Sequence, residues 1–411
     1  MSTLGAAATP LASAGHRMLK PGSTAFTVLL GALIAISPFA MDIYLSSMPS
    51  MGASLGTTAT RVQLTLSVYM YGLGAAQLVA GPLSDRFGRR RVLIAGIAVF
   101  AAASLACAAA PNVEALIAMR LVQALAVAVC GTVPRALVRD LHSGDDAAHL
   151  LSLMGVVLGV APIVAPIIGG QLQVAFGWRS TFAFVTLYAL VVLVVVWRGL
   201  PETLREADHR ALAPAAMMRN FAKCLSSRVY VGYFLVACFA FCGLFAFLAG
   251  SSFVFEAVMG HGAREFGFLF GAVMLGNVSG AVISSRVVRR FGIDRVIRVA
   301  ASLALVAGAS MAALAWMDVR HPAAVVVPMF VYMIGLMLTA PQAMAGAMTP
   351  FPRMAGAATS LLAFGQFLFG STSALIVGLT YDHTSRPMAT TIGVSALLTF
   401  VASRALIRAP H

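Results

Sequence analysis

Charged side chains are scarce in this sequence. Only 10% of the 411 residues are Asp, Glu, Lys or Arg, whereas 60% are hydrophobic, and an average soluble domain carries about 25% charged residues. So few charges cannot form a water-facing shell, which excludes a soluble globular protein. The longest polar interruption, 200–228, is too short for a folded domain and argues against a sensor or a scaffold.

Histidine is nearly missing from the apolar segments, where only His149 at the start of 148–173 falls within a predicted span, and cysteine is rare. A membrane enzyme would need a nucleophile with its base, or metal ligands, inside those segments. The cysteines have neither metal-site nor disulfide spacing; they are Cys107, Cys130, Cys224, Cys238 and Cys242. We therefore predict that the chain is not an enzyme and needs no cofactor. Residues 1–15 have no basic region followed by an apolar one, so no cleaved signal peptide is expected.

Apolar runs of about 20 residues, the length that spans a bilayer, recur along the chain. We predict an all-α polytopic membrane protein with twelve transmembrane helices. They are expected at 24–46, 61–84, 91–110, 113–136, 148–173, 179–199, 229–253, 265–286, 293–316, 322–347, 355–381 and 388–407.

The net charge of +14 does not indicate a nucleic-acid partner, because the basic residues are not gathered on one polar domain. Instead, Lys and Arg concentrate in the two tails and in the turns on the same side of the predicted bundle. The exceptions are Arg120, inside a span, and Arg61, Arg179, Arg264, Arg320 and Arg386, on the other side. By the positive-inside rule both termini lie in the cytoplasm, and a bacterial inner membrane is the expected location.

The polar segment in the middle of the chain divides the spans into two sets of six. The predicted domains are a tail 1–23, a six-helix bundle 24–199, a cytoplasmic linker 200–228, a second six-helix bundle 229–407 and a tail 408–411. This layout is typical of transporters that bind their substrate between two repeated bundles. The repeat is weakly visible, since GPLSDRFGRRR after span 2 is echoed by SSRVVRRFGIDR after span 8.

Asp42 is the one acid inside an apolar span, and Arg120 is the one base. A buried ionised carboxylate costs several kcal/mol unless it is paired, solvated or protonated, so an acid at this place suits a proton carrier. Both residues are expected in the outer third of the bilayer. One interpretation makes Asp42 the proton-binding acid of a central cavity and Arg120 its electrostatic partner. The alternative is a structural ion pair that holds spans 1 and 4 together.

The string GPLSDRFGRRRVL crowds an acid and several bases into a turn of a few residues. Gly81 permits close helix approach, and Asp85 stands among Arg86, Arg89, Arg90 and Arg91, with Gly88 between them. An acid in this place can pair with the bases or cap a helix N-terminus, forming a latch that breaks when the bundles rock. The alternative is a positive-inside anchor, which leaves Asp85 and the glycines unexplained.

Span 5 contains GVVLGVAPIVAPIIGGQL. Its prolines, Pro162 and Pro166, remove backbone donors and predict a kink. Its glycines allow close helix approach; they are Gly155, Gly159, Gly169 and Gly170. A bent, closely packed span suits a moving gate, and the alternative is plain small-residue packing.

Spans 1, 4, 7 and 10 would line the cavity of such a transporter. Candidate substrate contacts are the aromatic and amide residues Tyr44, Gln123, Phe239, Gln342 and Gln366, because such surfaces bind lipophilic molecules with few orienting hydrogen bonds. A packing role is the alternative for each. Glu256, just past span 7, is either a second titratable group near the outer mouth or a solvated loop end.

Several motifs in order resemble the major facilitator superfamily, specifically its twelve-span drug:proton antiporters of the bicyclomycin/chloramphenicol-resistance branch. The motifs are MDIYLSSMP, GPLSDRFGRRR, RLVQA, RALVRD, APIIGG, FGWRSTF and LPETL, within about residues 24 to 405. The resemblance implies a major facilitator fold with two six-helix bundles. Two departures are Ala124 and Ala165, where the family has glycine, and both are conservative for packing.

The resemblance also implies residue roles. Asp42 matches the branch's span-1 acid, and Arg120 matches the arginine associated with proton coupling. The conformational-switch loop corresponds to Gly81, Asp85, Arg86, Gly88 and Arg89, with Arg135 and Arg139 of RALVRD. The antiporter signature of span 5 corresponds to Gly159, Pro162, Pro166, Gly169 and Gly170.

The predicted function is proton-driven efflux of drugs or other small amphipathic molecules. Its expected partners are that substrate, protons and the lipid bilayer, and the chain is expected to work as a monomer. The alternative is proton-driven export of an endogenous metabolite, such as an amino acid derivative.

Overall fold

The computed structural model describes residues 19–407 apart from positions 21, 205 and 209–212. Across these residues, twelve helices are long and apolar enough to cross a membrane. The N-terminal half contains α1 (Thr24–Asp42), α2 (Met48–Ser54), α3 (Ala59–Phe87), α4 (Arg89–Ala108), α5 (Val113–Leu141), α6 (Gly144–Phe176) and α7 (Arg179–Gly199). The C-terminal half contains α9 (Arg228–Ser252), α10 (Ala263–Phe291), α11 (Ile293–Trp316), α12 (Ala323–Met348), α13 (Ala355–Leu379) and α14 (Arg386–Ala405).

The helices confirm the twelve predicted spans and correct their ends. The prediction ended span 4 at 136 and began span 5 at 148, whereas α5 continues to Leu141 and α6 begins at Gly144. The added turns contain polar residues such as Asp140 and Asp145, which apolar run length alone cannot place. In the linker, α8 (Pro214–Ser226) is a short helix that buries Cys224.

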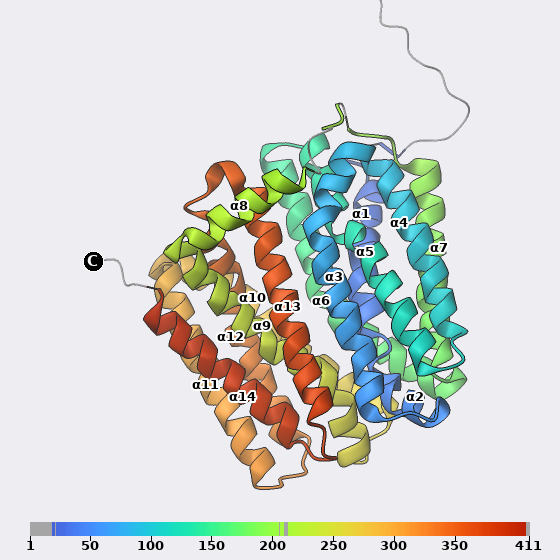
Figure 1. The fold of residues 1–411 in the computed structure, drawn as a ribbon, viewed down its shortest axis with the longest axis vertical. Helices are drawn as coiled ribbons and strands as arrows, with labels where there is room; N and C mark the ends of the chain where they lie inside the picture. Colours follow the sequence, from blue (N-terminus) through green and yellow to red (C-terminus); the bar gives the residue numbers. More distant parts are fainter. Residues whose placement is uncertain (1–18, 21, 205, 209–212, 408–411) are drawn as a thin grey trace, which may run out of the picture.

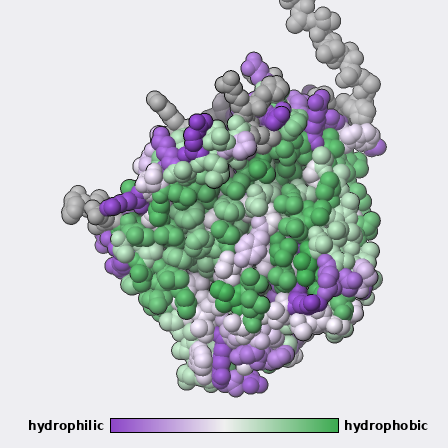
Figure 2. Space-filling view, viewed as in Figure 1, coloured by the Kyte–Doolittle hydropathy of each residue, from purple (hydrophilic) through white to green (hydrophobic). Residues whose placement is uncertain are grey.

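The two halves lie side by side, with blue to green helices on the right of Figure 1 and yellow to red helices on the left. Figure 2 shows a broad hydrophobic band across the middle of the visible face, with hydrophilic residues gathered above and below it. Large apolar side chains such as Val28 and Val191 are exposed, as expected for helices that face lipid.

The halves meet along two helix pairs, α3 with α13 and α6 with α10. In the first pair, the Thr60 hydroxyl donates to the Gly378 carbonyl at 2.9 Å, and the Tyr71 and Thr372 hydroxyls are 2.8 Å apart. These bonds lie toward the end of the molecule that contains α2, which we call the far end. The near end contains the turn at Gly88 and the linker helix α8 (Figure 1).

The second pair meets backbone against backbone. A Cβ at Gly267 of α10 would lie 2.7 Å from the Pro166 carbonyl oxygen of α6, and a Cβ at Gly170 would collide with the Ala263 carbonyl. Toward the near end, by contrast, a Cβ at Gly155 of α6 would meet no atom within 4 Å. In this seam between the halves, the close contacts between α6 and α10 therefore lie toward the far end, where they form what we call the far-end seal, whereas Gly155 borders open space toward the near end.

Candidate functional site

Asp42 is the last residue of α1, where the α-helix passes into a 3-10 turn, Leu45–Ser47, and then α2. The side chain is 1% exposed, and its Oδ1 atom has no hydrogen-bond partner. Among the described residues, Asp42 forms no ion pair. An ionised carboxylate in such a place costs several kcal/mol. The enclosure therefore favours a neutral, proton-bearing acid.

Arg120 lies close by on α5 and is 0% exposed. Its guanidinium donates to the Ala40 carbonyl at 3.0 Å and to Oε1 of Gln123 at 2.5 Å. It also stacks over two aromatic rings, with its Cζ atom 3.9 Å from the ring centroid of Tyr69 and 4.3 Å from that of Tyr44. Cation–π contacts of a desolvated cation are worth about 2 kcal/mol each. Both hydrogen bonds come from Nη1, and Nε and Nη2 are buried without a hydrogen-bond partner, so the charge is surrounded by the two rings and not by a carboxylate.

The structure corrects the alternative that Asp42 and Arg120 form a structural ion pair. Asp42 and Arg120 are not within the 4.0 Å of an ion pair, so spans 1 and 4 are not tied together by a salt bridge. They are joined instead by the bond from Arg120 to the Ala40 carbonyl, two residues before the acid. Acid and base therefore share one buried core without forming an ion pair with each other.

The predicted substrate contacts fall into two groups. Tyr44 and Gln123 are fully enclosed around Arg120, and Gln342 is mostly buried, donating to the Ser284 hydroxyl at 2.6 Å. In this arrangement these three support the protein core and do not present a surface to a ligand. Phe239, whose ring centroid is 5.7 Å from that of Phe369, and Gln366 are only partly buried.

The switch loop is held by charges within the N-terminal half. Arg89 pairs with Asp85 one turn before it and with Asp140 of α5, where Nε and Oδ2 are 3.1 Å apart. It also donates to the Ser84 hydroxyl at 2.6 Å. Gly88 has a φ of 99°, which side-chain-bearing residues rarely adopt, so the glycine permits the sharp turn between α3 and α4.

Glu202 completes this loop, and the sequence reasoning missed it. Its carboxylate accepts from the backbone N–H groups of Arg89 at 2.8 Å and Arg90 at 3.2 Å. It therefore caps the N-terminus of α4, where a negative charge is stabilised by the helix dipole. Glu202 belongs to the LPETL motif, which the sequence links to the family but to no specific role.

The other switch-loop residues lie around this cluster. Gly81 packs toward Thr132 of α5, and Arg86 lies 5.3 Å from the ring centroid of Phe87. Arg135 and Arg139 are exposed. All of the contacts described for the loop lie within the N-terminal half. The loop thus ties α3, α4, α5 and the segment after α7 into one body.

The signature residues of span 5 lie along the seam. Helix α6 runs without a break through Pro162 and Pro166. A Cβ at Gly169 would collide with the Ile43 carbonyl, beside Asp42, and Gly159 faces Val278 of α10 at 3.7 Å. Together with Gly170, these positions let α6 touch both the end of α1 and the opposite half.

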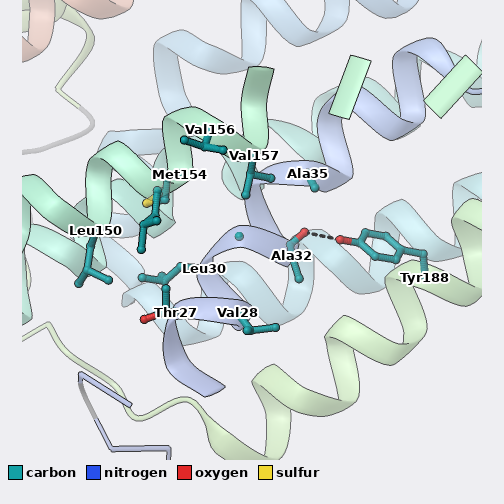
Figure 3. A pocket seen from close by; sticks show the side chains of 12 residues that line it. Thr27, Val28, Leu30, Ala32, Ala35, Leu150, Met154, Val156, Val157 and Tyr188 are labelled. Carbon is teal, nitrogen blue, oxygen red and sulfur yellow. Dashed lines mark hydrogen bonds between the residues drawn. The ribbon is translucent and has the colours of Figure 1, made fainter. Parts of the chain in front are cut away.

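A separate apolar cavity of about 460 Å³ lies between α1, α6 and α7. Figure 3 shows Leu30, Met154 and Val157 around it, and the Tyr188 hydroxyl donating to the Ala32 carbonyl at 2.8 Å. Exposed side chains such as Val28 line its rim. None of the predicted site residues lines it, so it is distinct from the Asp42 and Arg120 core.

The chain was compared with known proteins. It matches the family model of the Major Facilitator Superfamily over residues 30–374. It is 31% identical to a bicyclomycin resistance protein homolog of Haemophilus influenzae over 92% of this chain and 94% of the relative. It is 32% identical to a chloramphenicol resistance protein of Pseudomonas aeruginosa over 89% and 87%.

Among solved structures, a D-xylose-proton symporter superposes with a TM-score of 0.69 at 15% identity, covering 94% of this chain and 98% of that one. This confirms the predicted fold of two six-helix bundles. The relatives confirm the resemblance to resistance proteins and the prediction of a transporter and not an enzyme. The chain belongs to the Major Facilitator Superfamily.

Proposed function

We propose that the protein exports small amphipathic molecules, drugs among them, in exchange for protons. Two similar proteins carry names of bicyclomycin or chloramphenicol resistance, and they align with nearly the whole chain. The observation that carries the proton part of the proposal is the enclosure of Asp42, a carboxyl group without a countercharge at the end of span 1.

The neighbours of Asp42 suggest how proton and substrate compete. With the acid neutral, Arg120 is held by the Ala40 carbonyl, Gln123 and the two tyrosine rings. When the acid loses its proton, its charge needs a partner in the same core, and that partner is either Arg120 or a cationic or polar substrate group. A site that accepts a proton or a substrate, but not both, exchanges one for the other.

Exchange of a proton for a substrate requires alternating access, and movement at the seam between the two halves would provide it. The Arg and Lys bias of the sequence places the near end in the cytoplasm, so the far-end seal corresponds to a state closed toward the outside. Rocking of one bundle against the other would open the far end and close the near end. Because Gly169 packs on Ile43, next to Asp42, the motion at the seam is passed directly to the acid.

The test is drug-driven proton movement in proteoliposomes, with chloramphenicol, bicyclomycin and a lipophilic cation compared across variants. Asp42→Asn keeps the size of the side chain and removes the proton site, so we expect bound drug but no coupled proton flux. Asp318→Asn is the matched control, since Asp318 is an exposed acid that pairs with Arg320. Normal coupling in Asp42→Asn would place the proton site elsewhere.

A further inference from the structure

A second acid lies within the far-end seal. Glu256 belongs to a π-helical segment, Phe253–Val258, that continues α9. The sequence left open whether Glu256 is a titratable group or a solvated loop end, and the structure excludes the loop. Its Oε1 atom is buried and has no hydrogen-bond partner among the described residues. π-Helical turns are rare and occur frequently at functional positions.

The segment with Glu256 packs against α2 of the opposite half, so the acid lies where the two bundles close on each other. Nearby on this end, the Gln173 amide of α6 donates to the Ser50 hydroxyl of α2 at 2.8 Å, while its own Oε1 is buried without a partner. The seal therefore contains buried polar atoms without partners, among them the acceptors Glu256 Oε1 and Gln173 Oε1 and the hydroxyls of Ser251, Ser252 and Tyr381. A protonated Glu256 would bring an O–H donor to this set without bringing a charge.

Among the described residues no cation forms an ion pair with Glu256, and Arg386 at the start of α14 lies over the Trp316 ring. Helix α2, with the sequence MPSMGAS, has no titratable side chain, and the last turns of α9 contain Ser251 and Ser252. The start of α10 has Arg264, which is exposed, and Glu265, which is bound to His261 at 2.8 Å. The turn before α14 contributes Tyr381, Asp382 and His383, and the Tyr381 ring packs on Phe253. None of these charged groups forms an ion pair with Glu256 in the described structure.

We propose that Glu256 is a second proton-binding site, which must be protonated for the outer seal to close. This rests on the proposed function only in calling the far end the outer one. When the seal opens, water reaches the carboxylate, and a hydrated glutamate is ionised at neutral pH. When the seal closes, as in this structure, the half-buried carboxylate is cut off from water at Oε1 and gains no partner there, so the group takes up a proton. Closing is thus linked to proton binding, and low pH favours the closed seal.

This proton differs from the one assigned to Asp42. Glu256 is within the seal, so it takes its proton from the outside and returns it to the outside when the seal reopens. The site therefore biases the gate without adding to the number of protons exchanged per drug. Replacing Glu256 with Gln should leave that stoichiometry unchanged.

The experiment measures the seal directly, with spin labels at Ser54→Cys and Thr380→Cys. Both positions are exposed at the far end, on opposite halves, and all five native cysteines are buried. The background contains Asp42→Asn, so any remaining pH response has another source. Between pH 8 and pH 5.5 we expect the closed population to grow, by up to about tenfold per pH unit for a single linked proton. Adding Glu256→Gln should make the seal closed and independent of pH.

Glu265→Gln is the matched control, since Glu265 is an exposed glutamate at the same end, and it should leave the response intact. A pH response that survives Glu256→Gln, or none in the starting background, would overturn the proposal. If Glu256→Gln does not fold, infrared spectroscopy on the background protein decides: a protonated carboxyl band must appear as the seal closes, and its absence contradicts the site. The experiment uses no drug, so its result can be interpreted even if the protein does not export drugs.

Discussion

The two halves make the same interhelical bond with different chemistry. In the N-terminal half, Arg120 of span 4 donates to the Ala40 carbonyl of span 1 at 3.0 Å. In the C-terminal half, Tyr332 of span 10 donates to the Ala240 carbonyl of span 7 at 2.9 Å. Both donors are buried, but only the first is a cation. Each half thus joins two of its central helices by one buried side-chain-to-carbonyl bond, and the charge is present in the N-terminal half alone.

The loops at the near end differ in the same way. The turn between α3 and α4 is tied by Asp85, Asp140 and Glu202. In its counterpart between α10 and α11, Asp294 accepts from the Tyr233 hydroxyl at 2.5 Å and its carbonyl accepts from Arg298. The N-terminal half thus contains both the buried cation and the ion-paired turn, whereas the described residues of the C-terminal turn form no ion pair.

The largest effect on transport should come from replacing Arg120, the charged one of the two interhelical donors. Arg120→Gln removes the cation but keeps a hydrogen-bond donor, and we expect coupled transport to fall about tenfold or more, as for loss of a charge-assisted hydrogen bond of roughly 1.5–3 kcal/mol. Arg120→Lys should recover part of the activity, because it restores charge without the planar stacking. Proteoliposome flux measures both, and equal activity in Gln and wild type would contradict a role for the charge.

A smaller effect is expected in the latch. Glu202→Gln weakens the cap on α4, and losing such a cap costs about 1 kcal/mol. We expect a lower melting temperature and a modest loss of transport. Asp294→Asn, at the corresponding turn of the other half, should change transport less. Thermal unfolding in detergent and flux in vesicles test the pair, and a larger effect of Asp294→Asn would reverse the proposed difference.

The smallest effect on transport should come from replacing Tyr332, the neutral one of the two interhelical donors. Tyr332→Phe removes one hydroxyl that bonds the Ala240 carbonyl, which costs about 1 kcal/mol of stability, while the ring continues to pack against Gly243. Drug-coupled proton flux should remain near the wild-type level. Loss of coupling in this variant would show that both halves take part in proton transfer.

The sequence predicts the fold well because the bilayer sets the length of each apolar run. It fails at helix ends such as Leu141, where polar turns extend beyond the hydrocarbon. Asp42 and Arg120 stand out as lone charges inside spans, so their burial was predictable. The absence of an ion pair between them could not be predicted from the sequence. The rings of Tyr44 and Tyr69 take the place of the carboxylate, and no local sequence pattern shows that these rings contact Arg120.

Contacts between distant segments were also beyond the sequence. Glu202 follows span 6, and its cap on Arg89 and Arg90 joins residues more than a hundred positions apart. The roles assigned to Asp85, Gly170 and the other signature positions stay predictions, although the structure places them at a turn and a seam suited to movement. Burial at a specific interface, as for Glu256, requires the packed halves to be seen together.

The glycine seam has a consequence for inhibitor design. At Gly170 and Gly267 one half touches the other through bare backbone, and any side chain would keep the far end from closing. A compound bound in this seam would therefore select few resistant variants. A substitution that prevents the compound from binding would also prevent the two halves from closing. A substitution at Gly170 or Gly267 would therefore disturb the closing of the two halves as well as the binding of the compound.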